Sequence, residues 1–166
     1  MIDLSTFDNS TFDRGANRLK EAAWWLVRAG FFMGSIPLPS RIRVCFLRLF
    51  GAQIGRHCVI RSRVSISHPW RLEVGDHVWI GDDVRILSLD SVVVESNSCL
   101  SQETFICTGS HEFHRSTFDL TTKPIRIGAG SWLCARTFVG PGVTISPNTR
   151  CLPGAIVLSG RSHDND

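Results

Sequence analysis

The sequence carries an apolar ladder with a period of six residues. From residue 54 onward, an aliphatic or small apolar residue recurs every six positions, in blocks of three. The blocks are Ile54, Ile60, Ile66; Val74, Ile80, Ile86; Val94, Leu100, Ile106; Ile127, Leu133, Val139; and Ile145, Cys151, Val157. A period of six is not the helical period of 3.6, but it is a multiple of the strand period of two. The ladder therefore predicts an all-β chain, a parallel β-helix of hexapeptide repeats whose short strands form the flat faces of a prism.

The irregularities of the ladder all follow a third hexad. The first two blocks are each 20 residues long, counted from first position to first position, whereas the fourth is 18. Three hexads make one coil of a three-sided helix, so the two extra residues should bulge at one and the same corner. The long interruption between Ile106 and Ile127 leaves from that corner as well. It forms a protruding loop over residues 108–123, which a regular repeat fold would not need.

Small residues accompany the ladder. Glycine follows the ladder residue at Gly55, Gly75, Gly81, Gly128 and Gly140. At these corners we expect unusual backbone dihedrals or a close approach between coils. Four residues after the ladder positions, the chain places small or β-branched residues, which suit the inside of a narrow coil.

The segment before the ladder predicts two helices. The first should begin near Asn17 and carry Trp24 and Trp25, and Ser40 is a suitable N-cap for a second helix through Phe50. Two roles are open for them. They could cap the open first coil, which would otherwise expose strand edges, or they could lie on an anionic membrane through aromatic and basic side chains. Capping is favoured, because Trp- and Phe-rich stripes belong more often to a core.

The charge and the cysteines argue against a nucleic-acid-binding protein and a secreted protein. The net charge is +3, and all of it belongs to residues 1–53, which hold seven Lys or Arg and four Asp or Glu. This excess is too small and too local to predict a nucleic-acid partner. The six cysteines form no C-x-x-C pair. Cys58, Cys134 and Cys151 fall at repeat positions that suit small apolar residues, which predicts buried thiols in a reducing cytoplasm. Residues 1–13 are polar and acidic, unlike a secretory leader.

The protruding loop contains the candidate catalytic residue, His111. An imidazole can remove a proton from a hydroxyl near neutral pH, and loops on rigid scaffolds often carry such groups. Glu112 or Asp119 could orient the ring, whereas His114 is expected to be a surface residue. Cys107 beside the loop has no partner that marks a nucleophile. No H-x4-H pair is present, so no metal is expected.

Several segments resemble the hexapeptide-repeat acetyltransferases, and most closely the colanic-acid-biosynthesis acetyltransferases among them. The resemblance covers about residues 14 to 157. The segments that carry it are Trp24-Trp25, Leu47-Arg-Leu-Phe-Gly-Ala52, Ile54-Gly55, Pro69-Trp70, Cys107-Thr-Gly-Ser-His111, Ser116-Thr-Phe-Asp119, Lys123-Pro-Ile-Arg-Ile-Gly128, Trp132-Leu133 and Val139-Gly-Pro-Gly-Val-Thr-Ile145.

The resemblance implies a left-handed coil, a homotrimer, and acetyl-CoA bound in a groove between subunits. It implies that His111 deprotonates a saccharide hydroxyl, which attacks the thioester directly while backbone N–H groups stabilise the oxyanion. The family position that contacts the acceptor is usually Asn and falls here on Asp83, with Arg85 close by. Positions that contact the cofactor fall on Trp132, Ala135 and Pro153.

The chain departs from the family after Val157. Family members commonly continue with a Lys-containing strand and a Gly-Asn-Pro-Ala segment, whereas this sequence reads Leu158-Ser159-Gly160 with Arg161 as the nearby cation. The expected organisation is an N-terminal arm and helical cap (1–53), a β-helix (54–157) and a short tail (158–166).

We therefore expect a cytoplasmic O-acetyltransferase of exopolysaccharide biosynthesis, in possible peripheral contact with the inner membrane. Two alternatives stay open. One is a catalytically weakened scaffold of the same fold that lacks the C-terminal CoA-binding segment. The other is a metal-dependent hydrase of the same fold.

Overall fold

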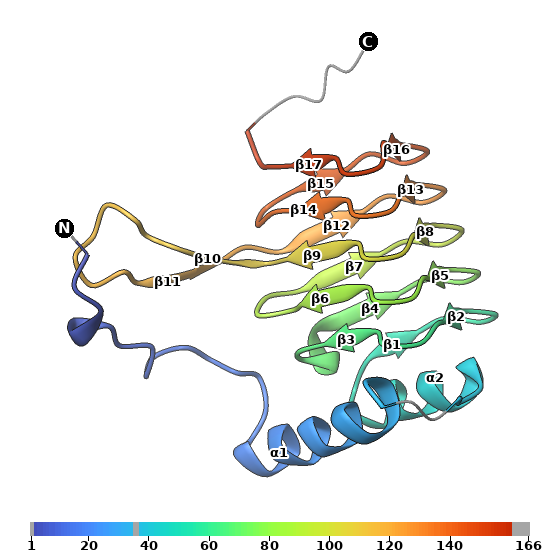
Figure 1. Ribbon diagram of the computed structural model, residues 1–166, viewed down its shortest axis with the longest axis horizontal. Helices are drawn as coiled ribbons and strands as arrows, with labels where there is room; N and C mark the ends of the chain where they lie inside the picture. Colours follow the sequence, from blue (N-terminus) through green and yellow to red (C-terminus); the bar gives the residue numbers. More distant parts are fainter. Residues whose placement is uncertain (1, 35–36, 161–166) are drawn as a thin grey trace.

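The computed structural model describes residues 2–34 and 37–160 and confirms the parallel β-helix (Figure 1). Each of three faces is a parallel sheet of five strands, one strand from each of five coils. Face A contains β1 (Gln53–Ile54), β4 (Leu72–Val74), β7 (Val92–Val94), β12 (Ile125–Ile127) and β15 (Thr144–Ile145). Face B contains β2 (Val59–Ile60), β5 (Trp79–Ile80), β8 (Cys99–Leu100), β13 (Trp132–Leu133) and β16 (Arg150–Cys151). Face C contains β3 (Ser65–Ile66), β6 (Arg85–Leu87), β9 (Phe105–Cys107), β14 (Phe138–Val139) and β17 (Ile156–Val157).

The six-residue ladder is the interior of the coil. Equivalent ladder residues of successive coils are direct partners, as in Ile54 opposite Val74 and Val74 opposite Val94. All fifteen ladder side chains are buried and join one core. The small or β-branched residues four positions later, such as Val64, Val84 and Thr104, are also fully buried. The period is therefore six because each face of the coil places one ladder side chain in the narrow interior.

The glycines after ladder residues serve close approach rather than unusual dihedrals. A Cβ at Gly128 would lie 2.5 Å from the Pro147 nitrogen in the next coil, and one at Gly81 would lie 2.9 Å from the Gln102 nitrogen. The left-handed backbone instead falls three residues after the ladder position. There, φ is positive at His57, Arg63, His77, Asp83, Asn97, Glu103, Gly130, Arg136, Gly142, Asn148, Gly154 and Gly160.

The insertions lie at the corner between faces C and A. A short 3-10 helix, η3 (Pro69–Arg71), turns this corner in the first coil. In the third coil the chain extends from the same corner as β10 (Gly109–His111) and β11 (Leu120–Thr122), which pair antiparallel to form a hairpin. Figure 1 shows this β10–β11 hairpin projecting away from the three faces. The coil above resumes in register, since Ile127 is still opposite Val94.

The N-terminal helices lie under the first coil (Figure 1). A 3-10 turn, η1 (Leu4–Thr6), precedes α1 (Arg18–Val27), which Asn17 caps as expected and which continues as a π-helical turn, η2 (Arg28–Phe32). The second helix, α2, spans Ser40–Leu49. The expected capping role of Ser40 is wrong, because Ser40 is the first helical residue. Its hydroxyl accepts the Ile60 N–H at 2.8 Å and so ties α2 to β2. Phe50 follows the helix rather than ending it.

Helix side chains satisfy the open edge of every face. The Arg48 guanidinium donates to the Ile54 carbonyl, that of Arg43 donates to the Ile60 carbonyl, and the Trp24 indole donates to the Ile66 carbonyl at 2.9 Å. Trp24 and Leu47 also enter the core. Because unpaired backbone carbonyls are costly when buried, these contacts stabilise the first coil. They are the contacts that a cap on the first coil would make.

Replacing a ladder residue should cost much more stability than replacing an outward residue of the same face. Ile86→Ala removes a side chain that is 1% exposed and leaves a cavity, so we expect a loss of about 2–5 kcal/mol. Ile156→Ala is the matched control, because Ile156 is 66% exposed on face C. Urea unfolding at one protein concentration measures both. Equal losses in the two variants would contradict the assignment of the interior.

Candidate active site

His111 lies on the β10–β11 hairpin, four residues after face C ends. It is the last residue of β10 and faces Leu120 across the hairpin. The hairpin is held at its base by the Thr108 hydroxyl, which donates to the Leu87 carbonyl at 2.7 Å. Thr108 is fully buried, so the strand that carries His111 starts from a fixed point in the core.

The imidazole of His111 has one nitrogen held by the backbone. Its Nδ1 lies 2.8 Å from the Phe118 carbonyl oxygen. A carbonyl can only accept, so Nδ1 carries the proton in the neutral ring and Nε2 keeps its lone pair. This is the arrangement that a general base requires, because the acceptor nitrogen is the one directed away from the backbone contact.

Two aromatic rings fix the plane of the imidazole. The Phe118 ring stacks on it at 4.2 Å with an interplanar angle of 4°, and the Phe7 ring lies 5.7 Å away at 56°. Phe118 has a φ of +50°, which is strained for a bulky residue. That conformation lets one residue supply both the carbonyl and the ring that hold His111.

The expectation that Glu112 or Asp119 orients His111 is wrong. The Asp119 carboxylate pairs with Arg115 at 2.9 Å instead. The Thr117 hydroxyl and the Arg115 guanidinium hold the pKa of Asp119 below its usual value. Phe118 lies in the Ser116–Asp119 segment that carries the resemblance, but its contact with His111 was not predicted, because a backbone carbonyl leaves no pattern in the sequence. Phe7 carried no sequence signal, because it reaches His111 from a distant arm.

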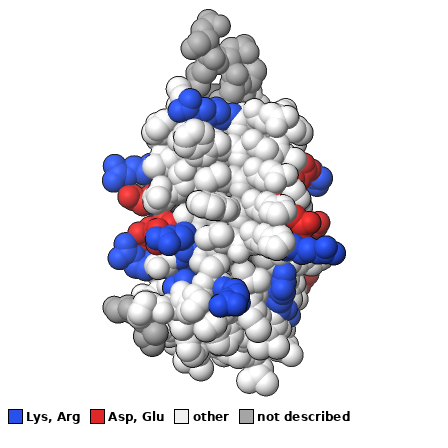
Figure 2. All heavy atoms as spheres, turned by 90° about the vertical axis from the view of Figure 1, so that its right-hand side faces the viewer, with Lys and Arg blue, Asp and Glu red and all other residues white. Residues whose placement is uncertain are grey.

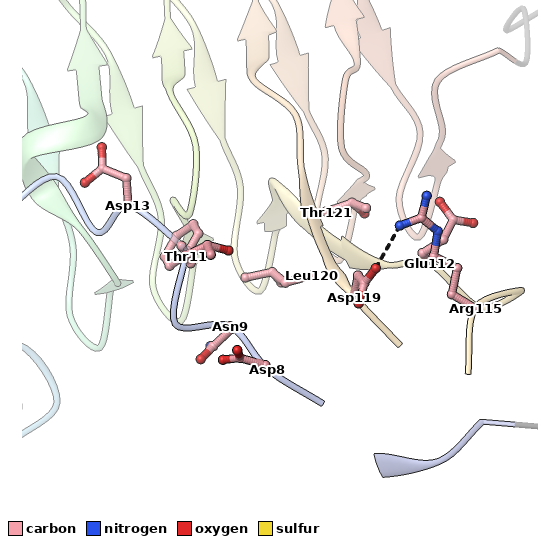
Figure 3. A pocket seen from close by; sticks show the side chains of 10 residues that line it. Asp8, Asn9, Thr11, Asp13, Glu112, Arg115, Asp119, Leu120 and Thr121 are labelled. Atoms are coloured by element: carbon pink, nitrogen blue, oxygen red, sulfur yellow. Dashed lines mark hydrogen bonds and ion pairs between the residues drawn. The ribbon is translucent and has the colours of Figure 1, made fainter. Parts of the chain in front are cut away.

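A cleft opens beside His111, between the hairpin and the N-terminal arm (residues 2–14). Its volume is about 610 Å³, and its walls are mostly polar (Figure 3). The lining side chains are Asp8, Asn9, Thr11, Phe12 and Asp13 from the arm and Glu112, Arg115, Asp119, Leu120 and Thr121 from the hairpin. The arm is fastened to the hairpin, since the Asp3 N–H donates to the Ser116 carbonyl at 2.8 Å. The cleft therefore begins at the residue next to His111 and at its cross-strand neighbour.

Asp83 and Arg85 lie at the opposite edge of face C. Asp83 sits at the corner between faces B and C and accepts two hydrogen bonds from Arg63, at 2.7 and 2.6 Å. This bidentate contact lowers the pKa of Asp83, so the group is a carboxylate. Arg85 lies over the Phe105 ring, 4.4 Å from its centroid. Both residues line a groove of about 600 Å³ along face C.

The three predicted cofactor positions lie on or next to face B in the fourth and fifth coils. Trp132 projects outward from β13, is 45% exposed and donates its indole N–H to the Ser101 hydroxyl at 2.8 Å. The Arg150 guanidinium lies 4.8 Å from the Trp132 ring. Ala135 and Pro153 occupy equivalent places on the corner after face B, where the Gly154 N–H donates to the Ala135 carbonyl. Arg161 lies outside the described residues.

Within one chain, the predicted residues form two groups. The width of face C separates His111 from Asp83, because the hairpin leaves the end of β9 whereas Asp83 precedes β6. His114 is exposed, and the buried Cys107 thiol contacts the Gly109 carbonyl at 3.2 Å. Among the residues that the structure describes, no three His, Cys, Asp or Glu side chains are placed to share a metal ion.

A coil of hexapeptide repeats with a projecting hairpin is the architecture of the hexapeptide-repeat acyltransferases. No protein-family model matches the chain. A colanic acid biosynthesis acetyltransferase of Escherichia coli (strain K12), WcaF, is 40% identical over 169 aligned residues, covering 96% of this chain and 93% of the relative. The chain belongs to the hexapeptide-repeat acetyltransferases.

Solved structures share the fold. A hexapeptide-repeat acetyltransferase of Vibrio cholerae O1, complexed with acetyl coenzyme A, superposes with a TM-score of 0.76 at 19% identity, over 91% of this chain and 81% of its own. A maltose O-acetyltransferase of Clostridium difficile gives a TM-score of 0.75 at 19% identity, over 85% of this chain and 78% of its own.

Proposed function

We propose that the protein is an O-acetyltransferase that moves an acetyl group from acetyl-CoA to a saccharide hydroxyl in exopolysaccharide biosynthesis. The observation that carries the reaction is the hydrogen bond from His111 Nδ1 to the Phe118 carbonyl, which leaves Nε2 as the free base. The substrate class rests on the 40% identical colanic acid biosynthesis acetyltransferase. The acyl donor rests on membership of the acetyltransferase family and on the acetyl-CoA complex of the Vibrio cholerae protein.

The reaction is a direct transfer. His111 Nε2 takes the proton of the acceptor hydroxyl while the hydroxyl oxygen bonds to the thioester carbonyl carbon. The carbon–sulfur bond then breaks, and the imidazolium returns the proton to the departing sulfur. One ester forms, one thioester is lost, and no acyl group is attached to the protein. Trp132, with the Arg150 guanidinium over its ring, and the Ala135 and Pro153 corner are the residues that would hold the donor.

The acceptor would occupy the cleft between the arm and the hairpin. Saccharide hydroxyls both donate and accept hydrogen bonds, and the cleft offers carboxylates, an amide and a guanidinium in one place. Its position beside Glu112 and Leu120 brings a bound hydroxyl to the His111 end of the hairpin.

We propose a homotrimer in which each active site is shared by two subunits. His111 and the pair Asp83 and Arg85 lie at opposite edges of face C, so a neighbour must bring the second group to the first. Face B supports an assembly, because its outward column is apolar in the first four coils. Figure 2 shows this uncharged stretch between charged corners. It contains Val59, Trp79, Cys99 and Trp132, of which Trp79 is 61% exposed, and Arg150 follows in the fifth coil.

Contact with a membrane is a further part of this proposal. No helix among the described residues has the length and apolar character needed to cross a bilayer. The helices do leave Leu26 and Leu49 exposed, with the basic side chains Arg18 and Arg41 also exposed nearby in the sequence. Apolar residues beside cations favour an anionic lipid surface.

Loss of His111 should abolish most turnover. We expect His111→Ala to lower kcat about 10²–10⁴-fold, the usual contribution of a general base, without changing acetyl-CoA affinity measured by calorimetry. His114→Ala is the matched control on the same hairpin and should keep kcat within a factor of about two. A His111→Ala enzyme with unchanged kcat would refute the assigned role.

Mixing two inactive variants should restore activity. His111→Ala and Asp83→Ala are each expected to be inactive alone. After co-refolding in equal amounts, a given site is intact with a probability of one half times one half, so about a quarter of wild-type activity should return. No recovery, in mixed trimers verified by mass, would contradict a shared site.

Binding to anionic vesicles should depend on the outer face of α1. Sedimentation with vesicles of phosphatidylglycerol and phosphatidylcholine is expected to pull down the wild type at low salt and less of it at high salt. Leu26→Glu should weaken this binding. Ile156→Glu, equally exposed at the other end of the coil, should not. Equal binding of both variants would refute the contact.

A further inference from the structure

A small pocket lies where α1 meets the first coil, at the corner between faces C and A. It has a volume of about 110 Å³, and its walls include Glu21, Trp24, Trp25, Arg28, His68 and Trp70. This volume is several times the roughly 30 Å³ that one water molecule occupies in the liquid. The pocket is separate from the cleft beside His111, and the transfer reaction described above does not use it.

Two polar atoms in this pocket are buried without a partner. Glu21 Oε1 and His68 Nδ1 have no hydrogen-bond partner among the residues that the structure describes, and both residues line the pocket. The other Glu21 oxygen, Oε2, pairs with Arg14 at 3.3 Å. Buried polar atoms are normally paired, so two unpaired ones on one small cavity mark a place where a polar molecule can bind.

The remaining walls are three tryptophan rings, the Arg28 side chain and Ser67. Trp24 is 2% exposed and packs against Phe32 and Phe50, and the Lys20 ammonium lies 5.0 Å from the centre of the Trp70 ring. The Trp25 ring is therefore the aromatic surface that a ligand can reach. Trp25 stands at the rim and is 59% exposed, an unusual position for a side chain of its size.

The polar atoms select a neutral hydroxylated ligand. The Glu21 carboxylate can only accept, so the ligand must donate there, whereas Arg28 and Ser67 on the same walls can donate to it. Burial, together with the charge of Arg71, lowers the pKa of His68, so its ring is neutral near pH 7. Hydroxyls both donate and accept, and hydroxyls on an apolar carbon ring against an aromatic side chain are the chemistry of a neutral sugar.

The N-terminal arm connects this pocket to His111. At one end of the arm, the backbone carbonyl of Arg14 accepts from the Trp70 indole, and that of Asp13 accepts from the Arg71 guanidinium. Nearer the other end, the Phe7 ring lies against His111. Figure 1 shows the arm running from the hairpin to α1. Six residues separate Phe7 from Asp13, a span of at most about 22 Å.

We propose that this pocket is a second saccharide-binding subsite, which holds a neutral sugar unit of an extended acceptor whose reacting unit lies at His111. The inference rests on the proposed acceptor class for its biological role, but the subsite can be tested without acetyl transfer. With such a subsite, the preferred acceptor is a chain of several sugar units rather than a single sugar.

Calorimetric titration with defined sugars tests the subsite directly. The probes are glucose, galactose, maltotetraose, cellotetraose and inorganic phosphate. We expect at least one tetrasaccharide to bind the wild type, and both Trp25→Ala and Glu21→Ala to lower that affinity at least tenfold. Leu19→Ala is the matched control, because Leu19 is 79% exposed on the same helix and does not line the pocket. It should change the affinity less than twofold.

Several results would overturn the proposal. They are the absence of any sugar binding, equal affinity in Trp25→Ala, Glu21→Ala and the control, and binding of phosphate in place of sugar. Trp25 is exposed and alanine favours helices, so both pocket variants should fold, which a thermal melt verifies.

His111→Ala separates this inference from the proposed function. It should bind the tetrasaccharide like the wild type while transferring no acetyl group. With acetyl-CoA present, Trp25→Ala should raise KM for a tetrasaccharide acceptor at least tenfold and leave kcat for a monosaccharide within twofold. An unchanged KM would refute a role in acceptor binding even if the pocket takes sugar.

Discussion

The close vertical stacking of coils governs this structure. Parallel strands of one face lie about 4.8 Å apart, so the backbone of each corner rests on the backbone of the next. At Gly128 and Gly81 there is no room even for a Cβ atom. The corners between faces A and B and between B and C are therefore uniform in length through all five coils. The insertions lie at the third corner, where η3 and the β10–β11 hairpin are found, and His111 lies there as a result.

The sequence predicted those parts of the molecule that repeat. The ladder has a period because the interior has one, and an interruption of that period revealed the loop of His111. The parts that hold His111 do not repeat. The carbonyl of Phe118 and the ring of Phe7 act through a strained turn and an arm distant in sequence. The corner positions with positive φ could not be predicted, because His, Arg, Asp, Asn and Glu occupy most of them. The glycines that follow the ladder residues allow a close approach between coils instead.

The helical cap shows how a repeat fold can end and also acquire a second task. Arg48, Arg43 and Trp24 satisfy one carbonyl on each face, which closes the first coil without a further strand. Beside α1, Glu21 Oε1 and His68 Nδ1 have no hydrogen-bond partner among the described residues, in the pocket next to Trp25. A cap alone would gain stability from a partner for these two atoms, which is why the pocket fits the proposed subsite.

The register across the hairpin has a consequence for how such a protein changes over generations. Ile127 stacks on Val94 although the chain between β9 and β12 makes a long excursion. Lengthening, shortening or replacing the hairpin therefore leaves the order of the coils untouched. The N-terminal arm touches the hairpin near its tip, through Asp3 and Phe7, and can vary together with it. The arm and the hairpin can therefore change together while the coils keep their arrangement.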